Sequence, residues 1–159
     1  MTYYDNFKSI WDVYVGIFLG YGTTLMCFPV LIFQLDISDI INKEYKFVFL
    51  CFVYSIGDIT SRMIHSSIKI DNRFRLHFAN FFKFMLVWVI WMFVHWVNKM
   101  IWFKIITVFL VGFFQGVIIV KYSLFGKKEL KNNPYDLGRM GHISIGMIYM
   151  GLCLSLIHI

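Results

Sequence analysis

Cysteine is scarce in this chain, and so are proline and acidic residues. The 159 residues include three Cys, two Pro and nine Asp or Glu. Cys27, Cys51 and Cys153 each lie in a different apolar run, which gives neither a disulfide framework nor a metal-ligand spacing. A His-Glu zinc spacing, a nucleophile elbow and a serine-histidine arrangement are missing as well. We therefore expect no enzyme, no metal site and no cofactor.

A removable signal peptide and a nucleic-acid-binding pattern are also missing. The leader, residues 1–10, holds both Asp5 and Lys8, and the apolar segment after it is long enough to span a membrane. The net charge is +6, but the basic residues lie mainly in short loops between apolar runs. The topology rule for membrane proteins explains that distribution, so we expect no nucleic-acid partner.

Apolar residues are what the chain has in abundance. Hydrophobic residues make up 59% of the sequence and aromatic residues 20%, and the mean hydropathy is +0.69. Soluble domains average about 45–50% apolar residues. The composition therefore predicts an all-α integral membrane protein in the lipid bilayer, with residues 1–159 as a single transmembrane domain. About 20 apolar residues cross the hydrocarbon, which predicts five spans: residues 11–35, 47–65, 78–97, 101–125 and 140–157.

The distribution of Lys and Arg predicts the orientation. Five spans place the chain ends on opposite sides. Outside the spans, the side of the N-terminus carries Lys8, Lys69, Arg73, Arg75, Lys127, Lys128, Lys131 and Arg139. The other side carries Lys43, Lys46 and Lys99 outside the spans and Lys104 in the first turn of the span 101–125. The positive-inside rule places the N-terminus in the cytoplasm and the C-terminus in the extracellular or lumenal space. We expect the plasma membrane rather than an organelle.

The second span carries two opposite charges. Asp58 and Arg62 lie four residues apart within residues 47–65, so on a helix they pair on one face. Ser55 falls on the same face and His65 about one turn beyond Arg62. A charge at bilayer depth costs a few kcal/mol or more and survives mostly beside a partner or water. Two roles remain open: a neutralised pair that orients helices, or the lining of a substrate path.

Glycine and proline mark close approaches and a bend. Gly16 and Gly20, like Gly112 and Gly116, have the small-xxx-small spacing that lets another helix approach closely. Pro29 removes one backbone hydrogen bond near the end of the first span. We expect a kink or hinge there.

Two further polar residues lie inside predicted spans. Lys83 either snorkels to the interface or reaches the same cavity as Asp58. Gln115 must form a hydrogen bond across to another group, either as interhelical glue, the commoner role, or as a substrate contact. An ion pair with Arg62 opposes protonation of Asp58, so we expect transport without proton coupling.

These residues resemble the C-terminal half of the equilibrative nucleoside transporter family. The segment YSIGDITSRM, residues 54–63, is similar to the family's eighth transmembrane helix, which carries an aspartate and an arginine at this spacing. Supporting similarities follow in order along the chain: Phe28-Pro29, Gln115-Gly116, the segment LFGKKEL and the glycines of residues 141–151. The chain departs from the family at Ser55 and Gln115, where many members have asparagine.

The resemblance implies helices 7 to 11 of a major-facilitator-like transporter. It implies facilitated diffusion of nucleosides or nucleobases by alternating access, with Asp58, Arg62, Ser55, Lys83 and Gln115 as substrate-binding residues. The family's six N-terminal helices are not in this sequence, so we expect either that another chain supplies the second bundle or that the sequence is a truncated gene product. The alternative is a non-transporting assembly or regulatory protein in which Asp58 and Arg62 form a structural pair.

Overall fold

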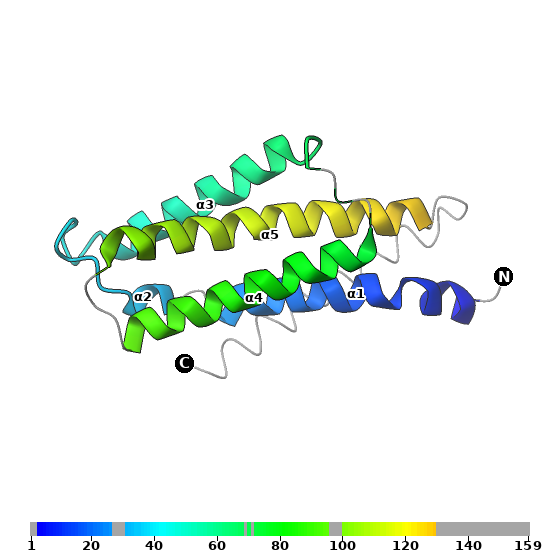
Figure 1. Ribbon diagram of the computed structural model, residues 1–159, viewed down its shortest axis with the longest axis horizontal. Helices are drawn as coiled ribbons and strands as arrows, with labels where there is room; N and C mark the ends of the chain where they lie inside the picture. The colour runs from blue at the N-terminus through cyan, green and yellow to red at the C-terminus, as the bar shows by residue number, and fades with distance from the viewer. Residues whose placement is uncertain (1–2, 27–30, 69, 71, 96–99, 130–159) are drawn as a thin grey trace.

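The described part of the chain is helical. A computed structural model describes residues 3–26, 31–68, 70, 72–95 and 100–129. In chain order its helices are α1 (Tyr3–Met26), the single turn α2 (Ile32–Gln34), α3 (Lys46–Ile64), α4 (Arg73–His95) and α5 (Ile101–Glu129) (Figure 1). Among these residues α3, α4 and α5 are long and apolar enough to cross a membrane. The expected all-α class is confirmed for the described residues, and three predicted spans correspond to helices of membrane-crossing length.

The boundaries of these three helices follow the sequence closely, with one exception. Helix α3 lies within one residue of the predicted span 47–65, and α5 continues past the predicted residue 125 to Glu129. Residues 66–77 were expected to be a loop, but α4 begins at Arg73. The Asn72 side chain accepts a hydrogen bond from the Phe74 N–H at 3.0 Å. An asparagine in this position caps a helix, which explains the early start.

The predicted first span, residues 11–35, is divided in the structure. Helix α1 begins at Tyr3 and ends at Met26, and α2 is a separate turn. Neither Gly nor Pro occurs between residues 3 and 10, so nothing in the leader opposes an earlier start. Helix α1 is not among the three described helices apolar enough to cross a membrane. The predicted hinge at Pro29 and the predicted span 140–157 lie outside the described residues.

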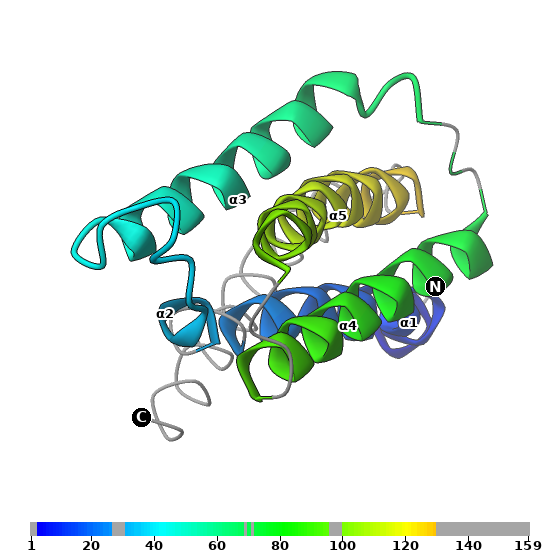
Figure 2. The same cartoon turned by 60° about the vertical axis from the view of Figure 1, so that its left-hand side comes forward.

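Helix α5 occupies the centre of the bundle. Figure 2 shows α5 between α3 on one side and α1 with α4 on the other. In α5, half of the most apolar 18-residue stretch is buried, whereas in α3 only 17% of the corresponding stretch is buried. Helix α3 is therefore the peripheral member of this arrangement.

Glycines bring the backbones of α3 and α5 together. A Cβ atom placed on Gly112 would lie 2.2 Å from the Tyr54 carbonyl oxygen, and one on Gly57 would lie 2.3 Å from the Phe109 carbonyl oxygen. On Gly116 it would lie 2.0 Å from the Ser61 hydroxyl. Such distances leave no room for a side chain, so the close approach predicted for Gly112 and Gly116 is confirmed.

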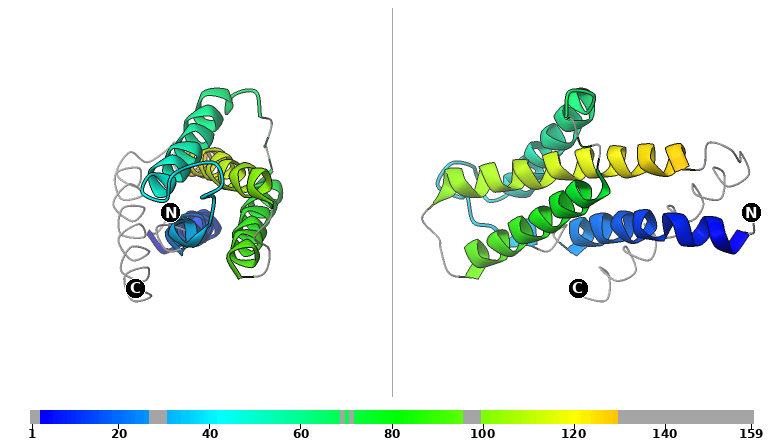
Figure 3. Two further views of the ribbon diagram at one scale, coloured as in Figure 1. Left: turned by 90° about the vertical axis from the view of Figure 1, so that its left-hand side faces the viewer. Right: turned by 45° about the vertical axis from the view of Figure 1, so that its right-hand side comes forward.

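Two apolar clusters fill the space between the helices. One joins α1, α4 and α5 and consists of Val13, Tyr14, Ile17, Leu76, Ala79, Ile118 and Tyr122. The other joins α2, the loop after it, α3, α4 and α5, and consists of Ile32, Leu35, Ile37, Leu50, Val87, Ile90, Phe93, Val108 and Val111. Figures 1 and 3 show the start of α1, the start of α4 and the end of α5 at one end of the molecule, which we call the N-terminal end.

Candidate functional site

The most deeply buried charged side chain of the candidate site is Lys83, at the middle of α4. Its side chain is fully buried. The ammonium group donates to the Gly20 carbonyl oxygen and to the Thr24 hydroxyl of α1, and to the amide oxygen of Gln115 on α5. A buried ammonium group needs such acceptors to offset its lost hydration. Lys83 therefore does not snorkel to the interface. Its side chain points inward, but its acceptors lie on α1 and α5 rather than beside Asp58, so the shared cavity expected with Asp58 is not seen.

Gln115 ties three helices together at this point. It lies at the middle of α5 and is 4% exposed. Its amide oxygen accepts from Lys83 of α4 and, at 2.8 Å, from the Thr24 hydroxyl of α1. The structure thus gives Gln115 the interhelical contacts expected of glue. We call Lys83, Gln115, Thr24 and the Gly20 carbonyl the Lys83 cluster.

A row of polar contacts continues from the Lys83 cluster toward the N-terminal end. Asn80 donates to the Gly16 carbonyl oxygen at 3.0 Å. Near the start of α4, Arg73 donates to both carboxylate oxygens of Asp12 at 3.1 and 3.2 Å, and His77 Nε2 lies 3.7 Å from the same carboxylate. These residues of α1 and α4 form what we call the α1–α4 seam.

Helix α5 closes the seam with Tyr122. The Tyr122 hydroxyl lies 2.8 Å from His77 Nδ1, and the side chain is 1% exposed. A Cβ on Gly16 would lie 2.1 Å from the Tyr122 ring, so the glycine provides the space that the ring occupies. The seam was not predicted from the sequence. Its signal is the spacing of Arg73, His77 and Asn80 on one helical face, but the predicted span 78–97 includes only the last of these residues.

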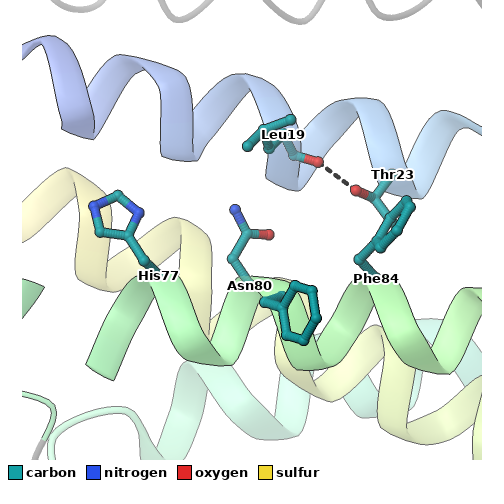
Figure 4. Close-up of a pocket in the computed structure, with 6 residues that line it drawn as sticks. Leu19, Thr23, His77, Asn80 and Phe84 are labelled. Atoms are coloured by element: carbon teal, nitrogen blue, oxygen red, sulfur yellow. Dashed lines mark hydrogen bonds between the residues drawn. The ribbon is translucent and has the colours of Figure 1, made fainter. Parts of the chain in front are cut away.

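A cavity of 260 Å³ opens beside the seam. It is lined by Leu19, Thr23, His77, Asn80, Phe81 and Phe84. Figure 4 shows Asn80 reaching from α4 toward α1, with His77 on one side and Phe84 on the other. Within the described residues the Asn80 side-chain oxygen is buried without a hydrogen-bond partner, while the Thr23 hydroxyl donates to the Leu19 carbonyl oxygen. The wall of the cavity is mostly apolar.

The Asp58–Arg62 pair lies on the other side of α5. Arg62 Nε is 3.0 Å from Asp58 Oδ2, so the predicted pairing along α3 is present. The Arg62 side chain is 49% exposed and that of Asp58 21%. Asp58 Oδ1 is buried against Gly116 and has no hydrogen-bond partner among the described residues. Tyr21 of α1 lies within electrostatic range of both charges.

The predicted site residues therefore fall into two groups rather than one. Gln115 faces α1 and α4, whereas its neighbour Gly116 faces Asp58 of α3. Ser55 joins neither group, because its exposed hydroxyl donates to the Cys51 carbonyl oxygen of its own helix at 2.8 Å. Helix α5 separates the Lys83 cluster from the Asp58–Arg62 pair.

The described residues contain no group of three or more His, Cys, Asp or Glu side chains able to hold a metal ion. Comparison with family models, curated proteins and solved structures finds no match to the chain. The site is therefore interpreted from its own geometry.

Proposed function

We propose that this chain is a multi-pass membrane protein that forms one bundle of a transporter for a polar organic solute. The observation that carries the proposal is the Asp58–Arg62 pair on the membrane-length helix α3, whose arginine side chain is half exposed. Lys83, fully buried at the midpoint of α4 and held by polar groups of α1 and α5, supports it. Helix α4 has 23 residues, or about 34 Å at about 1.5 Å per residue. A helix centred on the bilayer then holds Lys83 close to the midplane, where ionisable residues commonly mark solute or ion paths.

The outer surfaces of the helices support a bilayer around them. Helix α3 exposes Val48, Phe52, Ile56, Ile59 and Met63, and α4 and α5 expose Phe81, Trp88, Trp91, Trp102 and Ile106 among others. Apolar surface on this scale suits lipid tails or neighbouring helices. Exposed tryptophans near the turn between α4 and α5 suit the interface with water.

The Asp58–Arg62 pair supports the need for a second bundle. Arg62 lies in the last turn of α3, where its half-exposed guanidinium group needs water, lipid headgroups or protein beside it, because lipid tails cannot solvate the charge. Arg62 uses Nε for Asp58, which leaves the rest of the fork to face a solute. A solute whose ring or sugar both donates and accepts hydrogen bonds fits this surface. Nucleosides and nucleobases have such groups, and they are the solute class implied by the resemblance of residues 54–63. A rocking-bundle mechanism requires two such bundles around one midplane site.

The charge distribution supports the proposed orientation. Arg73 and Arg75 lie at the start of α4 and Lys121, Lys127 and Lys128 in the last turns of α5, which meet at the N-terminal end. Lys43 lies before α3, Lys46 at its start and Lys104 in the first turn of α5. The positive-inside rule then favours a cytoplasmic N-terminus. We retain the plasma membrane as the proposed location.

Equilibrium binding tests the solute class. The purified chain in nanodiscs is titrated with radiolabelled uridine, adenosine and adenine. We expect saturable binding of at least one of them, weakened at least tenfold in Arg62→Gln and unchanged within twofold in Lys43→Gln, which alters an exposed lysine at the opposite end. Absence of binding to all three solutes overturns this assignment. Saturable uptake into liposomes that hold only this chain overturns the need for a second bundle.

A second candidate function is a non-transporting assembly protein. It is favoured by the Lys83 cluster, whose groups bond one another across three helices and so hold the bundle together. The double variant Asp58→Arg with Arg62→Asp separates the two functions. If the variant folds and keeps its stability and its solute binding, the pair is structural. If it folds but loses solute binding, the pair belongs to a solute-binding site.

A further inference from the structure

A second cavity, of 270 Å³, lies beside the last turns of α5, at the N-terminal end of the molecule. It is lined by Lys121, Leu124, Phe125, Lys128 and Ile70. Lys121 and Lys128 are seven residues apart, close to two helical turns, so both lie on the same face of α5. Ile70, from the segment between α3 and α4, packs against the apolar cluster of α1, α4 and α5 and closes the cavity from the side.

The position of this cavity along α5 matches the boundary of a bilayer. This step rests on the membrane placement proposed above, with Gln115 near the midplane. At about 1.5 Å per residue, Phe125 lies about 15 Å from Gln115, which is the edge of a hydrocarbon core about 30 Å thick. Lys128 lies about 20 Å from Gln115. The Lys121 side chain starts inside this edge and reaches outward by its flexible stem.

The lining combines two cations with an apolar wall. None of its five lining residues is acidic. Ammonium groups bind phosphate as point charges. Leu124 is 48% exposed on the open side of the cavity, where the acyl chain of a lipid would pass. A free phosphate ion would gain nothing from these apolar side chains.

We propose that this cavity binds the phosphate of an anionic phospholipid, with Lys121 and Lys128 on the headgroup and Leu124 and Phe125 along the start of the acyl chains. Basic pockets beside membrane helices on the cytoplasmic side bind anionic headgroups in this way. The bound lipid would hold Ile70 against the end of α5.

The experiment measures transfer of a fluorescent phosphatidylglycerol to the protein in nanodiscs of phosphatidylcholine. Each lysine near an anionic surface contributes about a fivefold change in affinity. We expect Lys128→Gln to weaken binding about fivefold and Lys121→Gln with Lys128→Gln about 25-fold. The matched control is Lys127→Gln, because Lys127 is the exposed neighbour of Lys128 and does not line the cavity. We expect less than a twofold change in the control.

Two outcomes overturn the proposal. If Lys127→Gln and Lys128→Gln weaken lipid binding equally, the anionic lipid is attracted by the general positive charge of this end of the molecule and not by the cavity. Displacement of the labelled lipid by millimolar inorganic phosphate, with no loss in Leu124→Ser, would show a site for free phosphate. The helical content of each variant is checked by circular dichroism, and the single variant Lys128→Gln keeps the test valid if the double variant does not fold.

Discussion

The Lys83 cluster and the Asp58–Arg62 pair use similar groups in opposite surroundings. Lys83 is fully buried and is held by neutral acceptors from two other helices. Arg62 is half exposed and is held by a carboxylate one turn away on its own helix. The first arrangement joins helices, since removing any member leaves a buried polar group unpaired. Among the described residues the second shows no hydrogen bond to another helix, and it leaves half of the arginine side chain exposed to a partner or solute.

The largest effect is expected at the centre of the buried cluster. Gln115→Leu removes the acceptor shared by Lys83 and Thr24 and should lower the free energy of unfolding by about 2–3 kcal/mol, the usual contribution of a hydrogen bond to a charged group. Thermal unfolding of the protein in detergent, followed by circular dichroism, measures the change. Gln115→Glu keeps an acceptor oxygen and should lose less. Equal stability of Gln115→Leu and the wild type would contradict the role assigned to the cluster.

The second-largest effect is expected at the contact between α3 and α5. Gly112→Ala places a methyl group 2.2 Å from the Tyr54 carbonyl oxygen, and because backbone must move, we expect a loss of about 2 kcal/mol. Gly22 is the matched control, since nothing lies within 4 Å of a Cβ built there. Gly22→Ala should stabilise α1 by up to about 1 kcal/mol through helix propensity. In the same unfolding assay, Gly112→Ala should lower the free energy of unfolding and Gly22→Ala should raise it. If both variants lose stability, the loss at Gly112 does not have a steric cause.

A smaller effect on stability is expected at the Asp58–Arg62 pair. Neutralising both charges, in Asp58→Asn with Arg62→Gln, should change the free energy of unfolding by less than about 1 kcal/mol, because Arg62 is half exposed and the pair lies within one helix. Solute binding should fall at least tenfold in the same protein. A large loss of stability with unchanged binding would assign the pair to helix packing instead.

Sequence patterns predicted the parts of this molecule that depend on neighbours along the chain. The extents of α3 and α5, the contact between Asp58 and Arg62 and the close approach at Gly112 all follow from helical spacing. The burial of Lys83 did not follow. Periodicity gives the face of a helix on which a lysine lies, but not which helix covers that face.

The α1–α4 seam shows the same limit more clearly. Asp12 and Arg73 are separated by 61 positions in the chain, and Gly16 and Asn80 by 64. Their pairing depends on α1 and α4 lying side by side, which no local pattern encodes. Asn72, which caps α4, was the local signal that could have extended this helix to Arg73 and brought His77 onto its polar face.

The smallest effect is expected in the loop after α2, far from both polar centres. The pKa of Asp36 is held below its usual value, mainly because the Ser38 side chain and N–H donate to the carboxylate, with lesser contributions from Lys46 and Lys104. A lowered pKa means that the folded protein favours the ionised form. The stabilisation is therefore fully present above the pKa of an unfolded aspartate, about 3.9, and is lost as the pH falls through the lower pKa of the folded protein.

Comparison of Asp36→Asn with the wild type over this pH range tests the effect. Their unfolding temperatures should differ slightly at pH 7 and converge as Asp36 takes up its proton, because the protonated acid and the amide are then both uncharged. Asp39→Asn alters an exposed residue of the same loop and controls for the loss of one negative charge. Because Asp36 is exposed to water, its charge is well screened and the expected difference is small. The buried ammonium group of Lys104 donates to the Asp36 carbonyl oxygen at 2.8 Å. A difference in stability as large as that of Gln115→Leu would therefore mean that this loop supports Lys104.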